Sequence, residues 1–111
     1  MNLKQIAEEL GLKILNEEVD LEREVTGGYV SDLLSDVMGN AREGELWITL
    51  QSHINVVAIA SLKDLAGIVL VKGILPDSLM LEKAREEGIP VLATTRTTFQ
   101  TTGLIYKMME S

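Results

Sequence analysis

The segment from Thr94 to Thr102 contains the side chains best suited to bind an anion. It holds six threonines and one arginine, Arg96. Thr97 and Gln100 have the spacing of a capping box, which predicts that a helix starts here. Hydroxyl groups, a guanidinium and the free N–H groups of a helix start together favour anion binding. The candidate residues are Thr95, Arg96, Thr97 and Thr98. The alternative is that threonine only favours the preceding strand and that Thr97 only caps the helix.

Three further polar clusters each follow an apolar run. The runs are Val25–Val30, Leu46–Leu50 and Ile68–Val71, and the clusters are Ser31-Asp32, Gln51-Ser52-His53 and Lys72-Gly73. Lysine can meet a phosphate, and glycine lets a ligand approach the backbone closely. The competing interpretation is structural: Ser31, Asp32 and Ser52 cap helices, and Lys72-Gly73 is an ordinary turn.

The sequence predicts no catalytic centre and no metal site. His53 is the single histidine, and the chain has no cysteine to complete a zinc site. Ser52 adjoins His53 in the chain, so their side chains diverge, and no Gly-x-Ser-x-Gly motif is present. The phosphate-binding P-loop and the Gly-x-Gly-x-x-Gly motif are also absent. We therefore expect a protein that is not an enzyme, and the sequence names no cofactor.

The clusters alternate with segments that have helical spacing. Asn2 is expected to cap a first helix that ends at Gly11, and Asn16–Glu24 is expected to be a surface loop. Further helices are expected after Ser31 or Asp32, with Leu33, Leu34, Val37, Met38 and Ala41 facing inward, after Ser52, from Pro76 to Glu87, and from Thr97 to about Met109. Short strands are expected at Leu12–Leu15 and Val91–Ala93, besides the three runs above.

This alternation predicts a three-layer α/β/α domain with a mostly parallel sheet of about five strands. The carboxyl ends of parallel strands meet at one edge, and ligands bind outside that edge. A phosphorylated metabolite or a nucleotide is the kind of ligand that the clusters would suit.

Length and charge limit the classes of function. The 111 residues are enough for one domain, 1–111, and not for two. The net charge of −7 argues against nucleic-acid binding, which needs a basic surface. No leader precedes the first helix and no apolar run could span a membrane, so we expect a cytoplasmic protein.

One helix is apolar on nearly all sides, from Val56 to Leu65, which predicts burial all round. The last helix adds Gly103, Ile105, Met108 and Met109, and methionine-rich surfaces adapt to partners. A homodimer that works with a protein partner is therefore the alternative to ligand binding.

From Arg23 to Tyr106 the chain resembles the DRTGG domain family. The resemblance is carried by Val25–Ser35, Leu46–His53, Gly73 with Pro76-Asp77, and Gly88–Leu92. Where many members have Asp-Arg and Thr-Gly-Gly, this chain has Gln51-Ser52-His53 and Val71-Lys72-Gly73. The resemblance implies a regulatory, non-catalytic module that tends to form dimers. It also implies a fold similar to the N-terminal domain of HPr kinase/phosphorylase and to the regulatory region of some phosphotransacetylases.

Overall fold

Five short strands form one sheet, as the alternating sequence predicts. The computed structural model describes residues 1–16 and 18–110. The strands are β1 (Lys13–Ile14), β2 (Gly27–Val30), β3 (Glu45–Thr49), β4 (Gly67–Leu70) and β5 (Val91–Ala93), in the order β1-β5-β4-β3-β2. Strands β2 to β5 are parallel, and β1 pairs antiparallel with β5. The expected mostly parallel sheet is confirmed.

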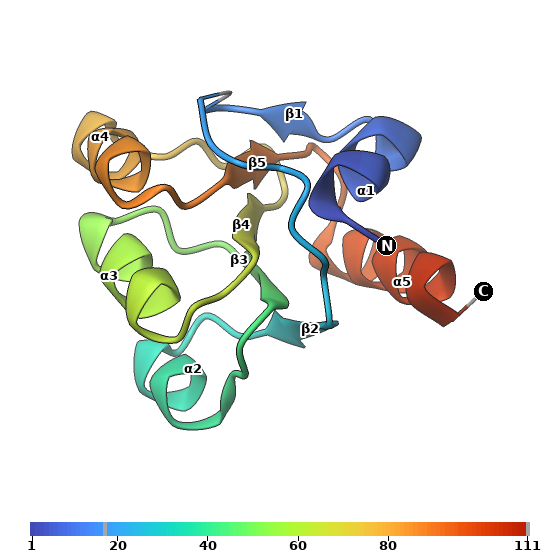
Figure 1. Cartoon of the computed structure of the whole chain (residues 1–111), viewed down its shortest axis with the longest axis horizontal. Coiled ribbons are helices and arrows are strands. Elements are labelled where there is room, and N and C mark those ends of the chain that lie inside the picture. The colour runs from blue at the N-terminus through green and yellow to red at the C-terminus, as the bar shows by residue number, and fades with distance from the viewer. Residues whose placement is uncertain (17, 111) are drawn as a thin grey trace.

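Five helices cover both faces of this sheet. Helices α2 (Leu34–Asn40), α3 (Ile54–Leu62) and α4 (Ser78–Glu87) lie on one face, and α1 (Leu3–Leu10) and α5 (Thr98–Glu110) lie on the other (Figure 1). Successive strand residues serve opposite cores: Trp47 and Ile68 belong to the α2–α4 core, whereas Leu46 and Val69 belong to the α1–α5 core. This alternation follows from the pleat of a strand, and it gives the expected three layers. Among the described residues, no helix is both long enough and apolar enough to cross a bilayer.

The helix ends that carry strong local signals form as predicted. The Asn2 side chain accepts from the Gln5 N–H at 2.8 Å and starts α1. Asp77 caps α4 by accepting from the Met80 N–H at 2.7 Å, and Gly88 ends the helix in the left-handed conformation. Thr97 and Gln100 form the predicted reciprocal capping box of α5.

Two predicted helix starts are wrong. The residue before α2 is Leu33 and the residue before α3 is His53, and neither side chain makes a capping hydrogen bond. Ser31 accepts from the Leu33 N–H outside the helix, and Asp32 bonds to the β3 end instead. A short polar side chain near a helix start has several backbone partners within reach, so its position alone does not fix the cap.

Three apolar residues that the sequence places inward are exposed. Leu33 and Met38 are 63% and 38% exposed, so α2 buries less of its apolar surface than its pattern predicts. Leu62 of α3 is 71% exposed, so the prediction that this helix is buried all round is also wrong. Helix α3 packs between α2 and α4 and leaves its outer side free.

The segment after β1 was predicted as a surface loop, yet its first residue is fully buried. The Asn16 amide donates to the Ile89 carbonyl at 2.7 Å, and its oxygen accepts from the Val91 N–H at 2.8 Å. Farther along, Arg23 forms an ion pair with Asp64 at 2.8 Å. The hydrogen bond that Arg23 donates to the Asp64 carboxylate in this pair is the main reason why the pKa of Asp64 is lowered. Asn16 and Arg23 are therefore both bound at the amino-terminal side of the sheet.

Candidate functional site

All four predicted polar clusters lie at the carboxyl edge of the sheet. Because β2 to β5 are parallel, the residues that follow each strand come to the same side. Strand β1 joins this edge from the opposite direction, since Lys13 pairs with Ala93 at the end of β5. We call this surface, formed by the strand–helix connections and residues 11–13, the carboxyl edge.

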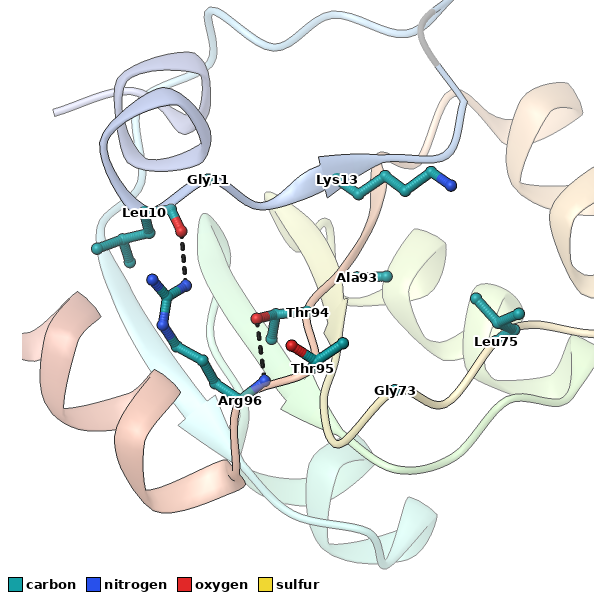
Figure 2. Close-up of a pocket in the computed structure, with 9 residues that line it drawn as sticks. All are labelled: Leu10, Gly11, Lys13, Gly73, Leu75, Ala93, Thr94, Thr95 and Arg96. Carbon is teal, nitrogen blue, oxygen red and sulfur yellow. Dashed lines mark hydrogen bonds between the residues drawn. The ribbon is translucent and has the colours of Figure 1, made fainter.

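One hollow at this edge has a volume of about 620 Å³. We call it the Arg96 hollow, and Figure 2 shows its lining side chains. The lining residues come from the end of α1, from β1, and from the connections after β4 and β5: Leu10, Gly11, Lys13, Gly73, Leu75, Ala93, Thr94, Thr95 and Arg96. The hollow therefore joins segments that lie more than eighty residues apart in the chain.

Arg96 has a structural partner inside this hollow. Its Nη1 donates to the Leu10 carbonyl at 2.6 Å, at the carboxyl end of α1 (Figure 2). The last carbonyls of a helix lack partners within the helix, and a cation there also suits the helix dipole. No other hydrogen bond of the guanidinium is present among the described residues. Arg96 thus anchors the end of α1 through one of its guanidinium N–H groups.

A tight turn forms the floor beside Arg96. Lys72 and Gly73 have φ values of 59° and 75°, and the Ile74 N–H donates to the Val71 carbonyl at 3.1 Å, as in a type I′ turn. The Lys72 N–H donates to the Arg96 carbonyl at 2.8 Å, so the two connections hold each other. The Lys72 side chain is exposed.

A second hollow lies on the other side of Arg96 and has a volume of about 530 Å³. Arg96 and Lys107 supply its cations, and Phe99, which is 89% exposed, supplies an aromatic ring. The remaining lining residues belong to α5, as do Phe99 and Lys107, and are Gln100, Gly103 and Leu104. The guanidinium of Arg96 therefore borders two neighbouring hollows.

Charge distinguishes these two hollows from others on the molecule. Their charged lining residues are Lys13, Arg96 and Lys107, and no carboxylate is among them. The hollow beside β2 and α5, by contrast, is lined by Glu45 and Glu110. In a chain with 17 acidic residues and a net charge of −7, the surface around Arg96 is locally positive.

The Asp32 and Gln51 side chains form a separate group at the ends of β2 and β3. One carboxylate oxygen of Asp32 accepts from the Thr49 hydroxyl and from the Leu50 N–H, both at 2.8 Å. The Gln51 amide donates back to the Asp32 carbonyl at 2.8 Å. These bonds tie the two connections together and occupy one carboxylate oxygen of Asp32 and the amide nitrogen of Gln51.

Nearby, Tyr29 of β2 donates its hydroxyl to Asp36 of α2 at 2.9 Å. This hydrogen bond is the main reason why the pKa of Asp36 is lowered and the pKa of Tyr29 is raised. The pair joins α2 to the edge strand of the sheet.

Ser52 and His53 lie near Asp77 but do not form a catalytic triad with it. His53 Nδ1 is 3.6 Å from an Asp77 carboxylate oxygen, and the His53 side chain is 73% exposed. The Ser52 carbonyl accepts from the Asp77 N–H at 3.3 Å, and no hydrogen bond joins the Ser52 hydroxyl to His53 in the described chain. A triad needs a nucleophile hydrogen-bonded to its base. Residues 1–16 and 18–110 also contain no cluster of three potential metal ligands.

The structure brings only some of the predicted site residues together. Gly73, Thr95 and Arg96 line one hollow, and Lys72 adjoins it. Thr97 and Thr98 begin α5, with the Thr97 hydroxyl engaged in the capping box. Several residues that line the two hollows were not among the predicted site residues, among them Leu10, Lys13, Leu75, Phe99 and Lys107. No sequence signal places β1 beside β5, so Lys13 could not have been assigned to this site.

Comparison with solved structures supports the fold. The structure is similar to the crystal structure of the CBS and DRTGG domains of the regulatory region of Clostridium perfringens pyrophosphatase, complexed with its activator diadenosine tetraphosphate. The TM-score is 0.68 and the sequence identity is 19%. The match covers 93% of this chain and 45% of that one, so the chain spans less than half of the neighbour.

A comparison with curated proteins finds no match. The family model of the DRTGG domain matches residues 5–108. This match covers nearly the whole chain and confirms the resemblance that the strand and turn motifs indicate. The chain belongs to the DRTGG domain family.

Proposed function

We propose that residues 1–111 act as one regulatory, non-catalytic domain that binds an anionic small molecule at the carboxyl edge. The observation that carries this proposal is the absence of carboxylates from the lining of both hollows at Arg96, in a strongly acidic chain. An anion there meets a guanidinium with unused N–H groups and the hydroxyls of Thr94 and Thr95.

The ligand class we propose is a phosphorylated metabolite or a nucleotide. Phosphate oxygens match the planar donors of a guanidinium. The exposed ring of Phe99 offers a face on which a base can stack. The pyrophosphatase regulatory region to which this chain is similar is complexed with a dinucleotide activator, which makes nucleotides the first compounds to test.

The test is a thermal-shift screen of the purified chain against nucleotides, diadenosine tetraphosphate, acetyl phosphate and inorganic phosphate, followed by calorimetry. A ligand at a hundred times its dissociation constant adds about 2.7 kcal/mol of stability. Arg96→Ala should weaken binding at least about tenfold, which corresponds to the loss of one charge-assisted interaction. Arg85→Ala, which removes a cation from α4, should leave the affinity unchanged.

The proposal fails if no compound shifts the transition, or if Arg96→Ala and Arg85→Ala have the same small effect on affinity. His53→Ala tests the extent of the site, because His53 lies beside α4 rather than in either hollow. An unchanged affinity for His53→Ala would confine the site to the surroundings of Arg96.

A second candidate function is a protein-interaction module that controls a partner without a ligand. The observation that favours it is the set of exposed leucines at the carboxyl edge, among them Leu33, Leu75 and Leu79, which are 62–67% exposed. Among the residues that suggested this function from the sequence, Val56, Val57 and Ile105 are buried in the core, whereas Leu62 and Gly103 are exposed.

A further inference from the structure

Strand β2 forms an open edge of the sheet. Among the described residues it pairs with β3 alone, while α2 and α5 lie on the two faces of the sheet next to it (Figure 1). Every second residue of an edge strand points its N–H and C=O groups away from the sheet, where another strand can bind them. Gly27–Val30 contains neither a charged residue nor a proline, two features that keep other strands from an edge. The outer side of β2 is therefore able to accept a further strand.

A hollow of about 390 Å³ lies along this strand, between β2 and the second half of α5, and we call it the β2–α5 hollow. Gly28 leaves room in it, because the nearest atom to a Cβ at this position would be the Leu46 carbonyl oxygen, at 3.7 Å. Val30, Met109 and Tyr106 also line the hollow, and Tyr106 is 65% exposed. A side chain from an added strand would therefore find both space and apolar contacts beside β2.

The charged groups of the β2–α5 hollow are all negative. They are Glu45 and Glu110, and neither forms an ion pair in the part of the chain that the structure describes. One carboxylate oxygen of Glu45 accepts from the Arg42 N–H at 2.6 Å, and the other lies 3.4 Å from the place of a Cβ on Gly27. Lys107, the basic residue in the last turn of α5, lines a different hollow. The carboxyl end of a helix is itself partly negative, so a cation is the complementary group.

A buried hydroxyl beside the hollow also lacks a partner. The Thr102 hydroxyl oxygen is shielded from solvent and makes no hydrogen bond within the described residues, and Thr102 lines the hollow. Buried polar groups without a partner are rare because they cost free energy. A polar group that enters the hollow can supply the missing hydrogen bond.

We propose that β2 and the β2–α5 hollow bind an extended, basic peptide segment of a partner protein. The segment adds as a strand to the outer side of β2, and one of its lysine or arginine side chains enters the hollow. The aliphatic part of that side chain packs on Met109 and Tyr106, and its charged end lies at the carboxylates of Glu45 and Glu110. Backbone hydrogen bonds supply affinity, and the basic side chain supplies specificity.

This surface is distinct from the sites considered above. Gly27 and Glu45 begin their strands and Glu110 ends α5, so the charged part of the hollow lies at the opposite end of the sheet from Arg96. The inference rests on the second candidate function, for which it names the chemistry of the partner and a further surface. It does not depend on ligand binding at the carboxyl edge.

Fluorescence anisotropy with a labelled seven-residue peptide tests the proposal. The probe has the sequence Thr-Val-Lys-Val-Lys-Val-Thr, in which both lysines lie on one face of a strand, and the comparison peptide has glutamate in place of both lysines. We expect the basic peptide to bind at least about tenfold more tightly than the acidic one at low salt, because like charges repel at the hollow. This difference should shrink at high salt.

Variants of the chain locate the site. The double variant Glu45→Gln and Glu110→Gln should raise the dissociation constant of the basic peptide at least about fivefold, through the loss of two exposed ion pairs. Glu9→Gln, which removes an exposed carboxylate from α1, should leave it unchanged. Gly28→Val should raise it at least about tenfold, because its side chain fills the hollow while valine suits a strand. Circular dichroism checks that each variant folds, and Tyr106→Ala gives a second test that leaves the strand unaltered.

Hydrogen exchange followed by NMR tests the backbone part of the proposal. The bound basic peptide should slow exchange at the outward N–H groups of Gly27–Val30, and binding without such protection overturns strand addition. Equal binding of the basic and acidic peptides, or no binding at millimolar concentration, overturns the proposal as a whole. A chain that self-associates in sedimentation until Gly28→Val is introduced also overturns it, because a second copy would then occupy the edge. None of these results affects the thermal-shift screen or the exposed leucines that support the second candidate function.

Discussion

Asn16→Ala should be among the most destabilising single substitutions in this chain. The Asn16 side chain is fully buried and bonds to two backbone groups, the Ile89 carbonyl at 2.7 Å and the Val91 N–H at 2.8 Å. Alanine leaves both groups buried without a partner, at about 1–3 kcal/mol each. We therefore expect a loss of roughly 2–6 kcal/mol in the free energy of unfolding, against a typical total of 5–15 kcal/mol.

The assay is urea unfolding followed by the fluorescence of Trp47, which is fully buried and reports the core directly. Asn40→Ala is the control, because Asn40 is an exposed asparagine at the end of α2. It should change stability by about 0.5 kcal/mol or less. A loss for Asn16→Ala no larger than that of the control would refute the argument that this amide satisfies the backbone before β5.

Asn16→Asp separates the donor from the acceptor at the same position. An ionised aspartate still accepts from the Val91 N–H but cannot donate to the Ile89 carbonyl, and its charge is buried. Burial raises the pKa of such a carboxyl in the folded state above its unfolded value of about 3.9. The Asn16→Asp variant should therefore be most stable below pH about 3.9, and it should lose stability as the pH rises through the folded-state pKa of the new carboxyl.

Two glycines give a matched test in the same urea assay. Gly44→Ala should lower the free energy of unfolding by about 1–3 kcal/mol, because Gly44 has a φ of 83° and a Cβ there would lie 2.8 Å from Thr26. Gly39→Ala should raise it by roughly 0.5–1 kcal/mol, because Gly39 lies within α2 and a Cβ there would meet open space. The hydrogen bond from Tyr29 lowers the pKa of Asp36 in the folded state. The contribution of the Asp36 carboxylate to the stability of the protein is therefore complete above its unfolded-state pKa, and it is lost as the pH falls through its lower folded-state pKa. Tyr29→Phe should move the Asp36 carboxyl titration, followed by NMR, upward, and an unmoved titration would show that the hydroxyl is not its main partner.

Much of the fold could be predicted from the sequence because its signals are local. The consecutive apolar residues within Glu45–Thr49 and the unbroken apolar run at Gly67–Leu70 indicate strands. Asp77, Gly88 and the Thr97–Gln100 pair mark helix ends, since each bonds within a few residues of itself. Such features need no knowledge of the tertiary structure.

The features that could not be predicted depend on distant partners. Asn16 is polar, and its burial is explained only by its hydrogen bonds to Ile89 and Val91, which lie 73 and 75 positions later in the chain. The direction of the Arg96 side chain also depends on a distant partner, because the carbonyl that accepts its hydrogen bond belongs to Leu10, 86 positions earlier in the chain. The sequence identified Arg96 as a candidate from its chemistry, but it could not show that α1 already uses one of its N–H groups.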